Sequence, residues 1–244
     1  MASGSFLISG ELVEPLLFDM VQILREDIEG LKIDYLRKGS KPWQPDLYLI
    51  RYGSKEAVFK DYAGKDFLCR LFVGIPAIYR EAYIYKRLGG LSGIPEFIGK
   101  VDRYAIIVGY IKGKDASRCR EGELPPIFFA RLREIIDRVH ARGIVLCDMR
   151  NSKNILVSVD QEPYLIDFST AFERGFRINI LRNFIFNIFY QDDLLGISKL
   201  KRQIAPHLLA GEEEEKLKKG LFLQKEAIFV RNHIRSILRR LVGS

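Results

Sequence analysis

Cysteine is scarce in this sequence, and its pattern excludes two classes of protein. The chain of 244 residues has three cysteines, Cys69, Cys119 and Cys147, an odd number without metal-ligand spacing. A disulfide-stapled secreted domain and a cysteine-based zinc site are both excluded, and a reduced, cytoplasmic setting is expected. The stretch "MASGSFLISGELVEPLLFDM" at the start contains acidic side chains and lacks a basic beginning, so it does not resemble a secretory signal peptide.

Long apolar runs and long basic runs are absent as well. No stretch is apolar enough for a membrane span, and no zinc-finger or RNA-binding consensus occurs, so we expect no dedicated nucleic-acid module. The formal net charge is nevertheless +8, with an isoelectric point near 9.3. Such a charge favours polyanionic partners such as nucleotide phosphates or an anionic membrane surface, and solubility alone would explain it equally well.

Hydrophobic residues make up 48% of the chain, enough for one sizeable domain or two small ones that share a cleft. Residues 11–38 have the spacing of an amphipathic helix, and the breaker-rich stretch 39–45 is interpreted as a linker. Short alternating runs predict a β-hairpin and further strands as far as residue 113, after which helical patterns dominate. No internal repeat is found. The predicted units are a helical extension with its linker, a strand-rich half and a helix-rich half: 1–45, 46–113 and 114–244.

Three segments have clear start and stop signals. The stretch 76–91 has helical spacing and ends in Gly-Gly, which favours a helix end there. The stretch 125–143 begins with proline and is followed by glycine, which is typical of an amphipathic helix. The stretch 154–168 predicts two short strands joined by a turn.

Asp148, Asn154 and Asp167 stand at the ends of apolar segments. An ionised carboxylate beside apolar strands is costly unless something pairs with it, and a divalent cation would do so. Two antiparallel strands over 154–168 would bring Asn154 and Asp167 to one edge, where both could ligate Mg²⁺. Asp148 would then orient a substrate hydroxyl. The competing interpretation makes each aspartate an ordinary turn or cap residue.

Lys60 and Glu81 supply the remaining groups that phosphoryl transfer from ATP requires. Lys60 lies in the predicted strand "AVFKDY", and Glu81 lies in the predicted helix "YREAYIYKRL". A glutamate on a helix packed behind a strand can hold a lysine extended toward the α- and β-phosphates. Taken singly, each would be an ordinary solvated residue.

In this order the residues resemble the catalytic and metal-binding segments of the protein-kinase-like superfamily: "HARGIVLCD", "NILV" and "LIDF", preceded by the strand lysine and helix glutamate. The resemblance spans roughly residues 47–170. It implies an α+β, two-lobed protein-kinase-like fold with a small β-rich N-lobe, a mainly helical C-lobe and, here, an extra N-terminal helix. It implies ATP and Mg²⁺ as cofactors, with Lys60 and Glu81 on the nucleotide, Asn154 and Asp167 as metal ligands, and Asp148 as the catalytic residue.

Some positions depart from the superfamily pattern. No Gly-rich loop of the form G-x-G-x-x-G is present, and the stretch "IRYGSKEAVF" offers only Gly53. Leu146-Cys147 stand where His-Arg usually precedes the catalytic aspartate, so a phosphorylated activation segment would lack its standard partner. No long activation segment is evident, and regulation by phosphorylation there is not expected.

Two further departures concern the metal ligands. Ser169 replaces the glycine of the usual D-F-G sequence and restricts the backbone there. The gap between Asp148 and Asn154 is one residue longer than usual. Asn154 fits the pattern best because it precedes "ILV", and Asn151 is the alternative ligand.

These departures resemble the small bacterial members of the superfamily, namely RIO-type kinases and kinases of the lipopolysaccharide inner core. The latter would place the acceptor, a sugar hydroxyl, on an anionic glycolipid at the inner face of the membrane. The apolar and basic segment 174–191 then has two interpretations, a surface that lies on a membrane or a buried C-lobe helix. Two other functions remain open: a serine/threonine protein kinase that acts on a protein, and a catalytically weak, pseudokinase-like nucleotide-binding or scaffold module.

The remaining polar residues near these motifs have weaker interpretations. Arg150 and Lys153 would contact the γ-phosphate or an anionic acceptor, or else be solvated. Asp192 or Asp193 would brace the catalytic loop. His140 stands at a predicted helix end, and we assign it no catalytic role.

Overall fold

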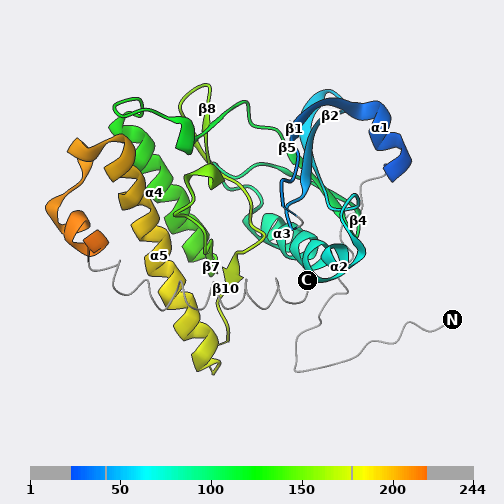
Figure 1. Cartoon of the computed structure of the whole chain (residues 1–244). Coiled ribbons are helices and arrows are strands. Elements are labelled where there is room, and N and C mark those ends of the chain that lie inside the picture. The colour runs from blue at the N-terminus through cyan, green and yellow to red at the C-terminus, as the bar shows by residue number, and fades with distance from the viewer. Residues whose placement is uncertain (1–22, 42, 177, 219–244) are drawn as a thin grey trace.

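Five antiparallel strands form the sheet of the first lobe in the order β1-β2-β3-β5-β4. The computed structural model describes residues 23–41, 43–176 and 178–218. Figure 1 shows this sheet on one side of the molecule and helices α4 and α5 on the other. The strands are β1 (Lys32–Arg37), β2 (Asp46–Tyr52), β3 (Lys55–Asp61), β4 (Phe97–Asp102) and β5 (Ala105–Gly109).

The hairpin predicted from the alternating runs is strands β2 and β3. Their register places Leu47 opposite Lys60 and Tyr52 opposite Lys55, with a turn at Gly53. Gly53 has a φ of 59°, a conformation that glycine adopts without steric cost. The sheet therefore carries Lys60 at the end of β3 that lies away from this turn.

The helix predicted over 11–38 is wrong over Lys32–Arg37, which form the edge strand β1. Only the 3₁₀ turn η1 (Arg25–Asp27) and the single helical turn α1 (Ile28–Leu31) precede it. Tyr35 packs edge-on against Tyr48 of β2, with ring centroids 4.5 Å apart, and such cross-strand aromatic pairs stabilise sheets. Residues 11–22 of the predicted helix lie outside the described residues.

Residues before β1 pack on the outer face of the sheet. Ile28 is buried there with Ile50, Phe59 and Ile107. Arg25 donates hydrogen bonds to Asp61 at 2.8 Å and to Asp102 at 2.5 and 3.0 Å. The segment that the sequence suggested as a separate extension is thus, in its described part, attached to the sheet of the first lobe.

The inner face of the sheet is covered by α2 (Phe67–Cys69), the π-helical turn η2 (Arg70–Gly74) and α3 (Ile75–Leu88). Helix α3 confirms the helix predicted over 76–91. Its buried residues Ile78, Ala82, Tyr85 and Leu88 belong to one apolar core that continues into the second lobe, where Phe128 and Leu132 join it. The two lobes therefore share a core, and α3 is the element between them.

The second lobe is built on two long helices, α4 (Pro126–Ala141) and α5 (Ile180–Ile204). Helix α4 confirms the prediction for 125–143. Short strands accompany these helices, β6 before α4 in sequence and β7 to β10 between α4 and α5: β8 pairs with β6 and β9, and β7 pairs with β10. Their bounds are β6 (Gly113–Asp115), β7 (Ile144–Val145), β8 (Ile155–Ser158), β9 (Pro163–Leu165) and β10 (Phe172–Glu173), with 3₁₀ turns η3 (Ala116–Arg118), η4 (Ser152–Asn154) and η5 (Pro206–Leu208).

Strands β8 and β9 confirm the two strands predicted over 154–168. The remainder of the chain is helical in α5 and over 211–218, and residues 219–244 lie outside the described part. No helix in the described part of the chain is both long and apolar enough to cross a membrane. The α+β fold with a sheet-rich and a helix-rich lobe is as expected, whereas the division at 45/46 and 113/114 stays a prediction.

Candidate active site

Lys60 lies between two carboxylates that come from different lobes. Its Nζ is 2.5 Å from Oε2 of Glu81 on α3 and 3.1 Å from Oδ1 of Asp167, which follows β9. The side chains of Lys60 and Glu81 are 8% and 2% exposed, whereas that of Asp167 is 37% exposed. The ammonium is therefore fixed from behind by Glu81 and faces solvent on the side of Asp167.

The charges of these three groups explain their pKa values. Burial raises the pKa of Glu81 to about 7, and the nearby ammonium of Lys60 only partly opposes this. Burial would lower the pKa of Lys60, but the negative charges of Asp167 and Glu81 outweigh it, so that pKa is raised. Burial also disfavours the charged form of Asp167, but Lys60 and Ser169 outweigh it and lower the pKa to about 2. Asp167 is thus ionised at neutral pH, and the cluster has an excess of negative charge.

The backbone at Asp167 is held in an uncommon conformation. Its φ of 66° lies in the left-handed region, which a non-glycine residue seldom adopts. Ser169 Oγ donates to Asp167 Oδ1 at 2.8 Å, and the ring of Phe168, fully buried, packs edge-on against Tyr85 of α3 at 4.8 Å. Such strain is typical of functional sites, where neighbouring contacts fix it. Ser169 therefore stabilises the carboxylate position that the missing glycine would otherwise leave unconstrained.

Asp148 and Asn154 lie in one loop and are bonded to each other. Asn154 Nδ2 donates to the backbone oxygen of Asp148 at 3.2 Å and to its Oδ2 at 3.3 Å. Asn151 is exposed, and its amide reaches Asp148 Oδ2 at 3.4 Å. The backbone N–H of Ile166 donates to the oxygen of Asn154 at 3.0 Å, which joins this loop to the segment before Asp167. The expected meeting of Asn154 and Asp167 at one strand edge is therefore observed.

The same three polar side chains share a small cavity. Asp148, Asn154 and Asp167 line it, with apolar walls from Leu146, Met149, Leu165 and Ile166. The structure thus brings together all five residues that the sequence singled out: Lys60 and Glu81 join Asp167, and Asp167 shares the cavity with Asp148 and Asn154.

The loop that carries Asp148 is held from behind by Asp193 of α5. Its carboxylate, fully buried, accepts from the N–H of Leu146 at 2.8 Å and of Cys147 at 3.2 Å, and lies 2.9 Å from His140 Nε2. Burial raises the pKa of Asp193, and the bond with His140 opposes that. Cys147 has a φ of 63°, so the residue directly before Asp148 is strained as well. The hydrogen bonds that Asp193 accepts from the N–H groups of Leu146 and Cys147 hold this strained turn in place.

Two further contacts from α5 fix the same loop. Asp192 is 2.7 Å from Nη2 of Arg150, and Lys199 Nζ donates to the backbone oxygen of Arg150 at 3.0 Å. Gly196 packs so closely that a Cβ there would lie 2.8 Å from Met149 Cβ and 2.9 Å from its carbonyl atoms. Both aspartates therefore brace the loop, where sequence reasoning expected one. Arg150 is tied to this brace, so its side chain is not a simple solvated cation.

Helix α3 is tied to the segment after Asp167. Arg80 Nη1 donates to the backbone oxygen of Ala171 at 3.1 Å, and Tyr83 donates to the Glu173 carboxylate at 3.0 Å. Arg87 lies 3.3 Å from the same carboxylate. These contacts hold the helix that carries Glu81 against the second lobe without a phosphorylated residue. Sequence reasoning missed them because they join residues about 90 positions apart, for which a single sequence holds no local signal.

The sheet register shows which turn lies beside Lys60. The Gly53 turn is at the end of the sheet away from Lys60, because Lys60 pairs with Leu47 and Leu47 pairs in turn with Arg37. The connection 38–45 between β1 and β2 is therefore the turn beside Lys60. Gly39 is required there, since a Cβ would lie 2.2 Å from the oxygen of Gln44. Because Lys32–Arg37 were predicted as helix, the residues that follow were interpreted as a linker and not as a turn between two strands.

The residues present fit Mg²⁺ and a nucleotide. Asp167 offers an ionised oxygen, and Asn154 offers an amide oxygen in the same cavity. Among the described residues, no three His, Cys, Asp or Glu side chains gather to hold a metal by themselves. Mg²⁺ in nucleotide sites is commonly held by one or two protein oxygens together with phosphates and waters. Lys60 would contact the phosphates.

A β-sheet lobe, a helical lobe and a lysine–glutamate pair between them define a protein-kinase-like fold. Neither a protein-family model nor a curated protein sequence matches the chain. Among solved structures, the Rio2 kinase from Chaetomium thermophilum is similar, with a TM-score of 0.52 and 17% identity over 76% of this chain. The chain spans 63% of the length of that protein. The Rio2 kinase-ADP/Mg²⁺-phosphoaspartate complex from the same organism has a TM-score of 0.50 and 15% identity, covering 80% of this chain and 72% of that one.

Proposed function

We propose that this chain is an ATP- and Mg²⁺-dependent phosphotransferase that moves the γ-phosphoryl group to a hydroxyl. One observation carries the proposal: Lys60 Nζ lies 2.5 Å from Glu81 and 3.1 Å from Asp167, whose carboxylate faces a cavity shared with Asp148 and Asn154. A structural ion pair would need Glu81 alone. The second carboxylate, turned to solvent, fits a site that receives a metal-bound phosphate.

The residues divide the work as follows. Lys60 binds the α- and β-phosphates, and Glu81 holds Lys60 in place. Asp167 and Asn154 would hold Mg²⁺, which neutralises charge on the transferred group when it is bound. Asp148 accepts the hydrogen bond of the acceptor hydroxyl and orients its oxygen for in-line attack. Fixed charges and dipoles supply most of the rate enhancement in such sites, because little covalent chemistry falls to the protein.

The acceptor belongs to the proposal as well. The net charge of +8 favours an anionic acceptor, and a sugar hydroxyl of a lipopolysaccharide core is the acceptor that we put first. A serine or threonine of a protein is the alternative. Radiolabelled ATP incubated with cell lysate and the purified chain distinguishes the two. Label in the lipid-extractable fraction supports the glycolipid, and label in the protein fraction supports the alternative.

The test of the transferase itself compares the wild-type chain with Asp148→Asn. Asparagine keeps the size of the side chain and its contact with Asn154, but it is a far weaker acceptor for the hydroxyl proton. We expect phosphate transfer to fall by about 100-fold or more while ATP binding persists. Equal transfer by the two proteins would remove Asp148 from the mechanism.

A nucleotide-binding scaffold is the second candidate, and the Ser169 position favours it. Ser169 Oγ donates to the same Asp167 oxygen that contacts Lys60, so that oxygen is already engaged. A thermal-shift measurement with ATP and Mg²⁺ separates the candidates in combination with the transfer assay. Stabilisation by nucleotide without transfer to any fraction supports the scaffold, since a ligand that binds only the folded state raises its stability.

A further inference from the structure

Five large apolar side chains project from the beginning of α5 and the turn before it. Phe176, Ile178, Ile180, Leu181 and Phe184 are 58–91% exposed. In Figure 1 this end of α5 extends below the rest of the second lobe. Single exposed apolar side chains are ordinary, but a contiguous set of this size marks an interaction surface. We call these five residues the α5 tip.

The core does not account for the α5 tip. Farther along the same helix, Phe186 and Phe189 are buried with Val145 and Phe172 and anchor α5 to the lobe. The apolar character of the tip therefore serves something outside the described part of the molecule. The sequence left two interpretations of 174–191 open, and the buried helix is observed for the portion that carries Phe186 and Phe189.

Arginine residues lie next to the tip residues in the sequence. The segment 174–191 has three arginines and no lysine, aspartate or glutamate. Arg174 and Arg182 are exposed, and Arg182 is positioned by donating from Nε to the backbone oxygen of Glu173 at 2.9 Å. Glu173, which directly precedes Arg174, pairs with Arg87 at 3.3 Å. The tip therefore combines projecting apolar groups with exposed positive charge.

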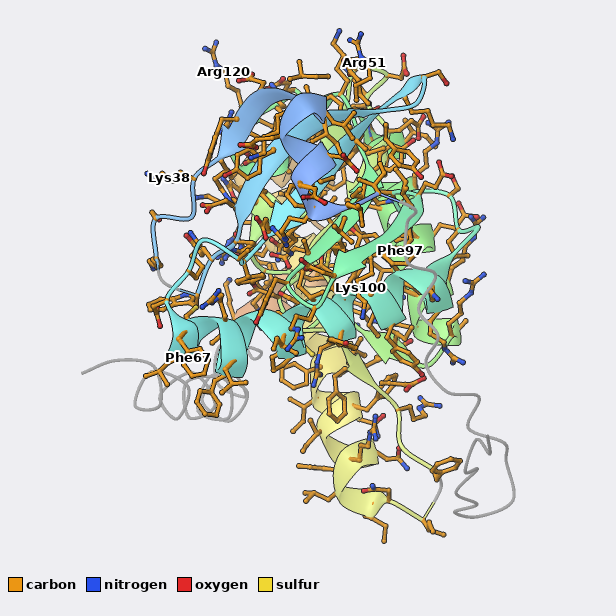
Figure 2. All side chains as sticks on the ribbon, turned by 90° about the vertical axis from the view of Figure 1, so that its right-hand side faces the viewer. Lys38, Arg51, Phe67, Phe97, Lys100 and Arg120 are labelled. Atoms are coloured by element: carbon orange, nitrogen blue, oxygen red, sulfur yellow. The ribbon has the colours of Figure 1, made fainter. Side chains whose placement is uncertain are left out.

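A second set of apolar side chains lies on α2 and η2 of the first lobe. Phe67, Leu68, Leu71 and Phe72 are 41–65% exposed. In both figures α2 lies at the lower edge of the first lobe, where Figure 2 labels Phe67, and the beginning of α5 extends farther in the same direction. The two sets can therefore meet one extended surface from the same direction.

This surface could be covered by a second copy, by another segment of the chain or by a lipid surface, and the charge of each decides which one fits. A second copy would bring the arginines of two α5 tips together. Residues 219–244 contain six basic side chains and one acidic side chain, so they too would place like charges side by side. Residues 1–22 have three acidic and no basic side chains, but the described chain that follows them begins beside α1 in the first lobe, away from α5 (Figure 1). An anionic lipid surface satisfies both the apolar and the basic groups.

We propose that the α5 tip docks the protein on the surface of an anionic lipid bilayer, with the apolar residues of α2 and η2 as a second contact. The apolar side chains enter the boundary between headgroups and acyl chains, and Arg174 and Arg182 bind lipid phosphates. The proposal does not depend on phosphotransfer, because binding to lipid is measured without nucleotide. The tip begins nine positions after Asp167, so docking would place the candidate active site near the membrane.

The experiment is flotation of the full-length chain with vesicles of phosphatidylcholine alone or of phosphatidylcholine with phosphatidylglycerol. We expect binding only to the vesicles that contain phosphatidylglycerol, and loss of that binding at high salt. Replacing Ile180 and Leu181 together by serine should weaken binding on the order of tenfold or more, because two projecting apolar side chains are lost. Arg182→Glu should weaken it as well.

Matched controls lie elsewhere on the surface. Ile127→Ser removes an apolar side chain that is 54% exposed on α4, and Arg120→Glu reverses a charge at the opposite end of the molecule in Figure 2. Both should bind like the wild type, and thermal unfolding of every variant checks that the fold is retained. Binding by the Ile180/Leu181 variant equal to the wild type, or no binding to anionic vesicles, overturns the proposal. Self-association abolished by that variant, without vesicle binding, would assign the tip to a second copy instead.

Discussion

The candidate site has a nucleotide-facing half around Lys60 and an acceptor-facing half around Asp148, and the contacts that hold these two side chains differ. Lys60 is almost buried and is fixed directly, at 2.5 and 3.1 Å, by carboxylates from both lobes. Asp148 is half-buried, and its carboxylate receives bonds of 3.3 and 3.4 Å from two asparagines. Short, direct bonds hold Lys60 in the nucleotide-facing half, whereas the Asp148 carboxylate in the acceptor-facing half receives longer bonds, and its loop is braced from behind by α5. A transferase benefits from this difference, because an acceptor hydroxyl can replace a long hydrogen bond more readily than a short one.

The largest predicted effect tests the nucleotide-facing half. Lys60→Met leaves Glu81 buried without its partner, and removing one member of a buried ion pair typically costs about 3–5 kcal/mol. Replacing Glu81 by glutamine in addition should restore at least half of that loss. Urea unfolding of the single and double variants measures both effects.

Strand β3 supplies its own control for this experiment. Lys55 pairs with Glu96 at 2.9 Å, and both side chains are more than 60% exposed. Lys55→Met should change the free energy of unfolding by less than about 1 kcal/mol, as exposed pairs do. Similar losses for Lys60→Met and Lys55→Met would mean that the Lys60 cluster is not the tight half of the site.

Removing the Asp193 carboxylate, which braces the Asp148 loop from behind, should give the next largest loss of stability. Asp193→Asn places an amide where a carboxylate accepts from two backbone N–H groups and His140, so at least one donor loses its partner. We expect a loss of about 2–3 kcal/mol in stability and up to about 100-fold in phosphate transfer, since the Asp148 loop shifts. Asp137→Asn, on the exposed side of α4, is the matched control and should alter neither quantity. An active Asp193→Asn variant of reduced stability would show that the brace does not position Asp148.

A substitution at Gly196, where α5 packs closely on the Asp148 loop, should have a smaller effect on stability. A Cβ at Gly196 would meet Met149 at 2.8 Å, so Gly196→Ala should cost about 1–2 kcal/mol and lower activity through the displaced loop. Gly211 has open space around it, and Gly211→Ala should be neutral or slightly stabilising. Guanidinium unfolding of both variants gives the comparison. A neutral Gly196→Ala would show that the loop can move away from α5 without cost.

The sequence predicted the five site residues better than it predicted the strands around them, and the reason is physical. Lys60, Glu81, Asp148, Asn154 and Asp167 stand at fixed places relative to local apolar patterns, and local patterns are what a single sequence shows. The strand β1 was mistaken for helix because an exposed edge strand has no buried face to set its periodicity.

The brace was only partly predictable. Asp193 contacts Leu146, 47 positions earlier, and the need for glycine at position 196 arises from the same long-range packing. Two adjacent acids at the end of an apolar run signalled that something polar lay nearby, but not which backbone groups they would bind. The location of the loop 38–45 beside Lys60 depended on knowing the sheet order, which no local pattern specifies.

The last prediction compares the two carboxylates that share Lys60, because their pKa values are shifted in opposite directions. Burial raises the pKa of Glu81 to about 7 from the ordinary 4.5. Between these values the folded state holds a proton that the unfolded state has released, so stability falls as pH rises through this window. Relative to Glu81→Gln, which lacks the titrating group, the wild type should lose up to about 1.4 kcal/mol per pH unit there.

Asp167 should act in a separate window. Its pKa is lowered to about 2 from the ordinary 3.8, chiefly by Lys60 against the effect of burial. The stability that it contributes is therefore present above about pH 4 and is lost as pH falls toward 2. Urea midpoints of the wild type, Glu81→Gln and Asp167→Asn across both ranges test this separation. If the curve of the Glu81→Gln variant runs parallel to that of the wild type from pH 4.5 to 7, then Glu81 is fully ionised beside Lys60. The nucleotide-facing half would then be a simple ion pair with a second carboxylate, rather than two carboxylates that compete for one ammonium.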